Sequence, residues 1–416
     1  MSLTETLRSR GLMVEASDLE GIDMLSGCSF YCGFDPTAAS LQVGNLVPLM
    51  AMAHVAKCSG LTPLALFGGA TGAIGDPSGK GSERKLLDRL AIDENVAKQR
   101  AQFGAIYERL GLQVEFVNNY DWTQSLSTLE FLRDVGKHFP MTYMLSKDSV
   151  KARLHDEGIS FTEFSYMLLQ AYDFYYLYQN KNCRLQVGGS EQWGNITAGL
   201  ELIRRKAAGE AYALTFPLLT DAQGKKLGKT ESGTIWIDPG MTSPYRFHQY
   251  WMNIGDSEVI KCLNFLTLHE AKQIEELQLS LEHAPEKREA QRVLADTLCA
   301  LVHGESASAA AKRGAQVLFG GSFEGLSQSE LLEIFKDVPS SNIATDKLGA
   351  LSIVDLFVET GLSKSKSEAR RLITSGGAYL NNERVADAEL KLSSFSAHNL
   401  LVLRSGKKSY HLVKRG

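Results

Sequence analysis

The sequence predicts an α/β protein that begins with a doubly wound parallel sheet and continues with a helical region and a small, basic α+β segment. Three observations lead to this fold class. Short β-like runs alternate with helical stretches up to about residue 220, helical periodicity dominates from 243 to 319, and the end of the chain is positively charged. Alternating strands and helices are typical of a parallel sheet covered on both faces.

The expected strands are four short β-like runs, each ending near glycine or asparagine: 28–34, 63–68, 113–118 and 183–189. Helical stretches lie between or after them, at 46–58, 95–110, 126–137 and 191–206. In such sheets ligands bind beyond the carboxyl ends of the strands. Five suggestive polar residues fall there: Asp35, Thr37, Asp76, Glu191 and Gln192.

Two segments far apart in the chain are the most informative: SFYCGFDPTAASLQVGN (29–45) and KKLGKT (225–230). The first reads as a strand, a glycine-bearing turn and a helix start, whose unpaired N–H groups and positive dipole end suit phosphate. The second is a small, cationic, glycine-hinged loop. Together they predict an enzyme that holds a triphosphate between two halves of its site.

The glycine-rich segment GGATGAIGDPSGKGS (68–82) follows a predicted strand but matches neither common phosphate loop. No G-x-G-x-x-G can be aligned in it, and Ile74 and Gly81 stand where a P-loop needs glycine and a hydroxyl residue. The segment 224–230 is one residue short of the P-loop spacing. We interpret these glycines as positions where the backbone approaches a ligand closely.

Tyr166, Gln170 and Asp173 are spaced to share one helical face. A solvent-facing stripe is the simpler interpretation, but their neighbours are strongly apolar, so we expect a buried helix. Polar groups on a buried helix need partners, and a polar ligand would supply them. Asp76, in GDPSG, either caps a turn or pairs with a ligand ammonium group, and the sequence leaves both interpretations open.

Composition indicates a globular protein that works in water. The chain has 416 residues, 44% of them hydrophobic and 22% charged, which is enough for two or three domains. No apolar run approaches the eighteen or so residues of a membrane-spanning helix, and the N-terminus lacks a signal-peptide pattern. We expect a cytoplasmic protein without a membrane partner.

The six cysteines favour buried, reduced thiols over disulfides or a metal site, because no C-x-x-C pair and no matching histidine spacing occurs. No protein-bound metal is therefore expected. The net charge of −4 is unevenly distributed. Residues 345–416 carry seven Lys and five Arg against seven acidic residues, a net of +5, so residues 1–344 carry −9. This asymmetry predicts a basic module that meets a polyanion, and an acidic body that does chemistry.

Basic residues near the C-terminus are candidates for RNA binding. Lys364, Lys366, Arg370 and Arg371 are spaced to share much of one helical face, and Lys407 and Lys408 form a second cluster. A solvated charge run is the alternative, and the residues alone do not decide between the two. The domain limits we expect are 1–220 for the sheet, 221–325 for the helical region, 326–348 for a linker and 349–416 for the basic module.

The chain resembles bacterial tyrosyl-tRNA synthetases, class I enzymes, over essentially its whole length. YCGFDPTAASLQVGN resembles the first signature region of the family, and KLGKT its lysine loop. Further blocks follow in the expected order: GGATGAIGDPSG, NNYDW, FLRDVGKHF, ISFTEFSYMLLQAYDF and GGSEQWGNITAG. The C-terminal stretch resembles an S4-type RNA-binding module. The resemblance implies a Rossmann-like catalytic domain, a helical domain and a small RNA-binding domain.

The resemblance implies tyrosine–tRNA ligation, in which tyrosine and ATP, with Mg²⁺, give tyrosyl-adenylate before transfer to tRNA. It places Tyr31 and Asp173 at the phenolic hydroxyl of the substrate. Asp76, Tyr166 and Gln170 would hold its ammonium group, with Gln192 near the carboxylate. Gly33, Asp35, Gly44 and Glu191 would lie at the nucleotide. The phosphates would face Thr37, Gln42, Asn45, Lys80, Arg84, Lys226, Lys229 and Thr230.

The sequence departs from the family at two places. The usual His-x-Gly-His of the first signature is Gln42-Val43-Gly44-Asn45, whose amides keep an N–H donor but cannot become cationic. Glu191 stands where aspartate is common. The missing histidines suggest an alternative, an RNA-binding regulator with a decayed catalytic domain; another nucleotidyl transferase of this fold is a third candidate. The family also implies a homodimer, through the region around 131–139.

Overall fold

The computed structural model describes residues 1–76, 87–147, 150–151, 158–220, 224, 227–230, 233–317, 320–323, 326–336, 338–392, 400–406 and 409–415; of Lys229 and Thr230 it describes the backbone only. The chain divides into two compact units. The first comprises residues 1–242 and 251–302, the second 243–250 and 303–416. The domain limits expected from the sequence remain a prediction, and the compact units divide at other positions.

The first unit contains the expected doubly wound sheet, with five parallel strands in the order β3-β2-β1-β4-β5. They are β1 (Ser29–Phe34), β2 (Thr62–Phe67), β3 (Glu115–Asn118), β4 (Cys183–Gly189) and β5 (Tyr212–Phe216). The first four confirm the predicted runs. The fifth, YALTF, is missing from the prediction because no glycine or asparagine follows it to mark its end.

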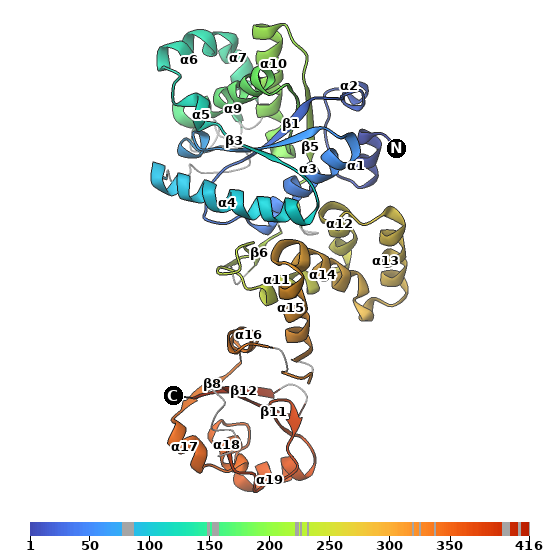
Figure 1. Ribbon diagram of the computed structural model, residues 1–416, viewed down its shortest axis with the longest axis vertical. Helices are drawn as coiled ribbons and strands as arrows, with labels where there is room; N and C mark the ends of the chain where they lie inside the picture. The colour runs from blue at the N-terminus through green and yellow to red at the C-terminus, as the bar shows by residue number, and fades with distance from the viewer. Residues whose placement is uncertain are drawn as a thin grey trace. The chain divides into compact units, whose positions relative to one another are not determined.

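Helices cover both faces of this sheet (Figure 1). They are α3 (Leu46–Ser59) and α4 (Arg89–Arg109) on one face, and α9 (Phe161–Asn180) and α10 (Trp193–Ala207) on the other. Strand side chains alternate between the faces. Tyr31 therefore packs in one cluster with Phe174 of α9, whereas Phe34 meets Phe103 of α4 with ring centroids 5.2 Å apart. The face that carries Tyr31 and α9 holds the candidate tyrosine site.

The outer edge of β5 is covered by the N-terminal segment. Val14 N donates to Thr215 O at 2.8 Å, and Thr215 N donates to Glu15 O at 2.8 Å, so the edge strand has partners on both sides. The remaining short helices of this part are α1 (Leu3–Ser9), α2 (Leu19–Asp23), α5 (Tyr120–Thr123), α6 (Thr128–Asp134) and α7 (Met141–Leu145).

The described residues from 243 to 317 are mainly helical, as the periodicity predicts. Its helices are α11 (Pro244–Met252), α12 (Asp256–Leu266), α13 (Ala271–His283), α14 (Glu289–His303) and α15 (Glu305–Val317). In the first unit Arg10 anchors α12, because its guanidinium donates to the carbonyls of Asn264 and Thr267 at 3.2 and 3.3 Å. These contacts tie α12 to the N-terminal segment, and residues 251–302 belong to the same compact unit as the sheet.

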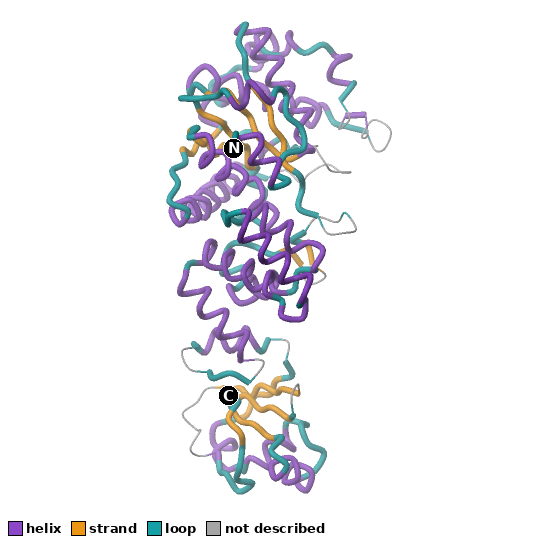
Figure 2. Tube along the Cα trace, turned by 90° about the vertical axis from the view of Figure 1, so that its right-hand side faces the viewer, coloured by secondary structure: helices purple, strands orange, loops and turns teal. Residues whose placement is uncertain are grey.

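The second unit is built on a mixed sheet in the order β10-β9-β11-β12-β8, coloured orange in Figure 2. Its strands are β8 (Ser340–Ile343), β9 (Ala378–Leu380), β10 (Glu383–Arg384), β11 (Leu400–Ser405) and β12 (Ser409–Arg415). Three helices pack on one face, α17 (Thr345–Ala350), α18 (Ile353–Glu359) and α19 (Lys366–Thr374), and α16 (Gln328–Ile334) packs on the other.

Strand β8 lies inside the stretch 326–348, for which the sequence predicts a linker. It runs parallel to β12 at the edge of the sheet, in register from Ser340 beside Leu412 to Ile343 beside Arg415. The run SSNI carries no apolar alternation, so the strand is held by main-chain hydrogen bonds and gives no signal in the sequence.

No described helix is both long and apolar enough to cross a membrane. All six cysteines are unbridged, and five of them are buried while Cys58 is exposed. Within the described ranges, no three His, Cys, Asp or Glu side chains gather in a group that could hold a metal ion.

Candidate active site

The core of the site is a pair of buried polar side chains on facing elements, Tyr31 on β1 and Asp173 on α9. Both are almost fully inaccessible, with exposed fractions of 1% and 3%. The Tyr31 hydroxyl has no hydrogen-bond partner among the described residues. A buried hydroxyl without a partner carries a free-energy cost, which a polar ligand group can remove.

Two residues from the segment after β3 hold the Asp173 carboxylate. Asn119 Nδ2 donates to Asp173 Oδ2 at 3.0 Å, and Trp122 Nε1 donates to Asp173 Oδ1 at 2.8 Å. Asn119 also donates to Thr71 Oγ1 at 2.9 Å and accepts from Ala70 N at 2.8 Å. It therefore ties β2, β3 and α9 together beneath the site. Sequence reasoning assigned no role to Asn119 or Trp122, although NNYDW directly follows a predicted strand.

Burial has the largest effect on the pKa values of Tyr31 and Asp173. Desolvation raises the pKa of Asp173 to about 7, against the opposing effect of the hydrogen bonds from Asn119 and Trp122. The pKa of Tyr31 lies well above its usual value, first because of burial and then because of the charge on Asp173. At neutral pH Tyr31 is a hydroxyl donor, while Asp173 is poised between acid and carboxylate.

A second cluster of polar side chains lies near the carboxyl ends of β2 and β4. Gln192 Nε2 donates to Asp76 Oδ2 at 2.7 Å, and Gln192 Oε1 accepts from Gln170 Nε2 at 3.3 Å. Asn195, which sequence reasoning missed, donates to Asp76 Oδ1 at 3.5 Å and to Gln192 Oε1 at 3.3 Å. The Gln170 Oε1 atom is buried and finds no partner among the described residues. The structure thus brings Asp76, Gln170 and Gln192 together, as the resemblance implies.

Tyr166 and Asp35 meet at the end of β1. The Tyr166 hydroxyl donates to the Asp35 carboxylate, at 3.2 Å from Oδ1 and 3.3 Å from Oδ2. Gly33, two residues earlier in β1, is open: a Cβ placed there would meet no described atom within 4 Å. This opening lets a ligand lie directly on the backbone of β1.

Glu191 follows β4 and folds back over its own strand end, since a Cβ on Gly189 would lie 2.4 Å from Glu191 Oε2. That oxygen is buried and lacks a partner within the described part of the chain. The pKa of the Cys32 thiol on β1 is raised to about 12 by burial and, secondarily, by the charge on Glu191. The site therefore has a buried acceptor available at the carboxyl end of β4.

The signature turn is the 3₁₀ turn Val43–Asn45 at the start of α3. Asn45 Oδ1 accepts from Gln42 N at 2.9 Å, so the oxygen end of this amide is engaged by the turn itself. Gly44 is exposed, and a Cβ there would meet no described atom within 4 Å. Thr37 is exposed as well, and its backbone N donates to Asp35 O at 2.9 Å.

The chain returning from KKLGKT lies directly against this turn. Val43 N donates to Ile235 O at 3.2 Å, and Gln42 and Trp236 form a bridge. Gly228 has φ +93°, and a Cβ there would lie 2.5 Å from Val43 Cγ2, so only glycine fits without a shift. The two segments that stand far apart in the sequence are thus neighbours in the first unit.

Some predicted site residues cannot be placed. Lys80, Arg84 and Lys226 lie outside the described residues, as do Lys407 and Lys408 of the basic module. For Lys229 and Thr230 the backbone forms the short strand β6 (Lys229–Thr230), paired with β7 (Gly233–Thr234).

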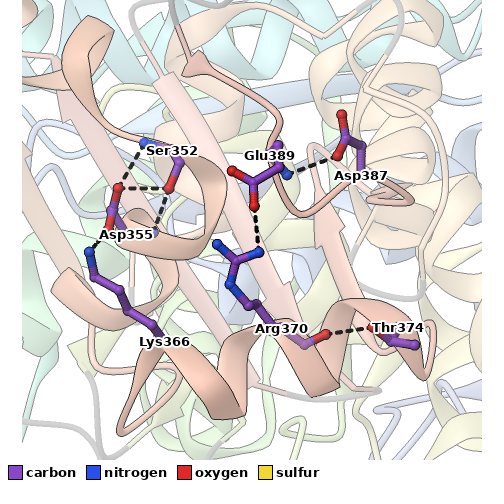
Figure 3. Close-up of polar contacts among 7 residues, drawn as sticks. All are labelled: Ser352, Asp355, Lys366, Arg370, Thr374, Asp387 and Glu389. Carbon is purple, nitrogen blue, oxygen red and sulfur yellow. Dashed lines mark hydrogen bonds and ion pairs between the residues drawn. The ribbon is translucent and has the colours of Figure 1, made fainter.

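The basic face of α19 is partly neutralised by carboxylates of the same unit (Figure 3). Lys366 forms an ion pair with Asp355 at 2.6 Å, and Arg370 pairs with Glu389. Arg371 bonds only weakly to its own helix, with Nε 3.4 Å from Ser367 O, and Lys364 is exposed. The sequence shows the three cations of α19 and Lys364 just before it, but not that Asp355 of α18 pairs with Lys366 and Glu389 with Arg370.

Comparison with known proteins identifies the family. A family model described as "tRNA synthetases class I (W and Y)" matches residues 26–320, and one described as "Tyrosine--tRNA ligase SYY-like C-terminal domain" matches residues 330–413. With the sheet order and the polar site at its carboxyl edge, this match defines a class I aminoacyl-tRNA synthetase.

Full-length relatives narrow the class. The chain is 48% identical to a tyrosine–tRNA ligase of Roseiflexus castenholzii, with 99% of each chain covered, and 47% identical to one of Geobacillus kaustophilus over the whole of both. It belongs to the tyrosine–tRNA ligase family. A truncated mitochondrial tyrosyl-tRNA synthetase of Aspergillus nidulans has a similar structure, with a TM-score of 0.69 and 29% identity over 76% of this chain and 94% of that one.

Proposed function

We infer that this protein activates tyrosine with ATP and transfers it to tRNA. In the first step a carboxylate oxygen of tyrosine attacks the α-phosphorus of ATP, and the bond to pyrophosphate breaks. In the second, a hydroxyl of the 3′-terminal adenosine attacks the tyrosyl carbonyl, and AMP leaves. The observation that carries the proposal is the buried pair Tyr31 and Asp173, whose free hydroxyl and half-ionised carboxylate suit a phenol.

The pair selects for the phenolic hydroxyl. The substrate hydroxyl donates to Asp173 and accepts from Tyr31, so it pairs both groups at once. Phenylalanine fits the same space but leaves the buried hydroxyl and carboxylate without this partner. Leaving such groups unpaired costs about 1–3 kcal/mol each, far more than a missing contact surface of one atom.

The cluster of Asp76, Gln170 and Gln192 holds the ammonium and carboxylate groups of the tyrosine substrate. Asp76 supplies a charge for the ammonium group, with Tyr166 and Gln170 as further partners. Gln192 reaches from Asp76 toward the substrate carboxylate, and its bond to Asp76 is 2.7 Å in the free protein. Since the tyrosine carboxylate is already a nucleophile, the step needs no general base, and orientation is the main contribution of these residues.

The nucleotide lies over β1 and the signature turn. Gly33 and Gly44 leave the backbone open, Asp35 and Glu191 face the adenosine, and the N-terminus of α3 supplies dipole and N–H donors to the phosphates. The lysines and Arg84 of the loops at 80–84 and 226–230 neutralise the charge that builds up on the α-phosphate and on pyrophosphate. ATP is the energy source, and Mg²⁺ enters with it.

The amides at Gln42 and Asn45 contribute geometry without a titratable charge, because neither can become cationic. The activation rate therefore shows no ionisation assignable to this turn. The missing histidines are the one observation that favours an inactive, RNA-binding regulator. The retained pocket for tyrosine and the retained loop lysines support the enzyme.

One assay separates these functions: ATP–pyrophosphate exchange with each of the standard amino acids in turn. Exchange with tyrosine alone supports the ligase. Exchange with another amino acid points to a different nucleotidyl transferase. No exchange at all, with intact tRNA binding, supports the regulator.

A homodimer is supported by apolar side chains exposed on α6, α7 and the start of α9. They are Leu129, Leu132, Met141, Leu145 and Phe161, with exposed fractions of 79%, 51%, 58%, 40% and 77%. A cluster of exposed apolar side chains favours a protein–protein interface. Leu132 lies within 131–139, the region that the family resemblance implies, and Leu129 and Met141 flank it. We propose the cytoplasm as the site of action, in keeping with six unbridged cysteines.

Tyrosine binding should depend on pH through Asp173. Since its pKa in the free protein is raised to about 7, the carboxylate that accepts the substrate hydroxyl forms as pH rises through 7. The Kd for tyrosine should fall from about pH 5.5 to about pH 7.5 and stay constant above it, as equilibrium dialysis can measure. Asp173→Asn is the control, because its Kd should not vary with pH. A flat wild-type profile would exclude this ionisation.

The raised pKa of Asp173 also makes the stability of the fold depend on pH. Stability should fall as pH rises, whereas tyrosine binding should strengthen. Between about pH 4 and pH 7 the folded chain binds more protons at Asp173 than the unfolded chain does. The stabilisation from this group is therefore fully present below its unfolded pKa and is lost as pH rises through 7. Free tyrosine in the pocket should reduce this loss.

The basic module, which we propose to be of the S4 type, binds tRNA through α19, Lys407 and Lys408. Arg371→Ala should weaken tRNA binding and reduce the slope of log K against log salt by about one, because one phosphate contact is lost. Glu389→Gln is the matched opposite, since it releases Arg370 from its carboxylate and should tighten binding. Filter binding across a salt series measures both. Equal affinities and slopes for both variants would place the tRNA elsewhere.

A further inference from the structure

Three amide side chains of α4 hold the segment 36–41, which leads from β1 to the signature turn. Asn95 Nδ2 donates to Pro36 O at 2.9 Å, Gln99 Nε2 donates to Ala38 O at 2.8 Å, and Gln102 Oε1 accepts from Leu41 N at 2.9 Å. Their spacing of four and three residues places all three on one helical face. The segment they hold has no regular structure of its own.

Gln102 differs from the other two because it also reaches the second phosphate-side segment. Its Nε2 lies 3.4 Å from Asp238 Oδ2, and Asp238 N donates to Ser40 Oγ at 3.0 Å. The chain at 235–238 runs back from the lysine loop, and Ile237 N donates to Leu41 O at 2.9 Å. Gln102 therefore joins the segment that leads to the signature turn to the return of the lysine loop, together with Ser40, and it does so from a third element, α4.

The tyrosine pocket is not involved in this junction. Gln102 is on α4, whose Phe103 packs on Phe34 at the opposite face of the sheet from Tyr31. A change at Gln102 should thus alter the alignment of the phosphate-side segments and leave the binding of tyrosine intact. Misplacement of catalytic groups by about 1 Å can cost about 10²-fold in rate.

We propose that Gln102 is a positioning residue for adenylate formation. It sets the distance between the signature turn and the segment returning from the lysine loop. Asn95 and Gln99 hold the chain at Pro36 and Ala38, which leads from β1 to that turn. The inference rests on the proposed function, because it assumes that these two segments meet the ATP phosphates. Gln102 itself touches neither substrate.

The first test removes both of its bonds. Gln102→Leu should lower kcat of tyrosine-dependent ATP–pyrophosphate exchange at least tenfold, with KM for tyrosine and the fraction of active sites within about twofold of the wild type. Gln113→Leu, an exposed glutamine just after α4, is the matched control and should leave both parameters unchanged. Equal losses in kcat and in tyrosine binding, or a loss explained by fewer active sites, would show a merely structural role.

The second test exchanges donor and acceptor in the hydrogen bond between Gln102 and Asp238. Gln102→Glu keeps the acceptor for Leu41 N but sets a carboxylate against Asp238, so kcat should again fall at least tenfold. Adding Asp238→Asn restores a bond with donor and acceptor exchanged, and kcat should return to within about threefold of the wild type. The new amide keeps an oxygen for Gly240 N, which Asp238 Oδ1 accepts at 2.8 Å. Failure of the double variant to recover would overturn the proposal.

A third measurement does not depend on activity. Hydrogen exchange of the Leu41 and Asp238 backbone amides should speed up at least tenfold in Gln102→Leu and stay unchanged in Gln113→Leu. If the wild type shows no exchange activity with any amino acid, the proposed function fails, and this measurement still decides whether Gln102 holds the two segments together. Unchanged exchange at both amides would overturn that role.

Discussion

Replacing Asp173 by alanine lowers kcat/KM for tyrosine in the exchange reaction by about 100-fold, corresponding to about 3 kcal/mol. The acceptor of the substrate hydroxyl is lost. In addition, Asn119 Nδ2 and Trp122 Nε1, which donate to the carboxylate at 3.0 and 2.8 Å, are left buried without their acceptor. The measurement is steady-state exchange with tyrosine and with phenylalanine.

The comparison with phenylalanine makes this prediction specific. Phenylalanine does not use the hydroxyl-binding pair, so its kcat/KM should change far less, and the preference for tyrosine should collapse. Tyr31→Phe is the milder companion, with an expected loss of about tenfold for tyrosine, because it removes one neutral hydrogen bond. If Asp173→Ala lowered activity with both amino acids equally, the residue would be structural and our placement of the hydroxyl wrong.

Lys229→Ala should reduce the rate of tyrosine activation by about 10²- to 10³-fold and leave the Kd for tyrosine within twofold of the wild type. A lysine that meets the phosphates acts when charge builds up on the departing pyrophosphate, whereas the proposed tyrosine pocket is built around Tyr31 and Asp173. The backbone of Lys229 in β6 follows Gly228, which packs against Val43 of the signature turn.

Stopped-flow or quench-flow measurement of adenylate formation gives the rate, and equilibrium dialysis gives the Kd. Lys98→Ala on the exposed side of α4 controls for the loss of one positive charge and should change neither. A variant at Lys229 that mainly weakened tyrosine binding would contradict our placement of the loop.

Local patterns predicted most of the elements but not all the pairings. The alternation of β-like and helical runs predicted four of the five strands of the first sheet, because each strand is bounded by turn residues. It missed β5, which lacks such a boundary, and β8, whose polar SSNI run joins the second sheet through main-chain bonds to β12. Edge strands held by backbone contacts leave little trace in side-chain periodicity.

In the candidate site, too, some residues could be predicted from the sequence and others only from the tertiary structure. The polar face of Tyr166, Gln170 and Asp173 was visible from helical spacing among apolar neighbours. Asn119 and Asn195 were not, because their roles depend on which side chains they meet across the fold. Likewise, the sequence shows the cations of α19 but not that Glu389 neutralises Arg370, nineteen positions away.

The sequence by itself determined the fold class and the chemistry of the two phosphate-side segments, since strand, helix and turn preferences and the residue types act locally. Only the tertiary structure decided how those segments meet. Val43 against Gly228, Leu41 against Ile237 and the bond from Gln102 to Asp238 join positions up to about two hundred residues apart. Such contacts are set by packing and by the need to pair every buried polar group, which no local pattern encodes.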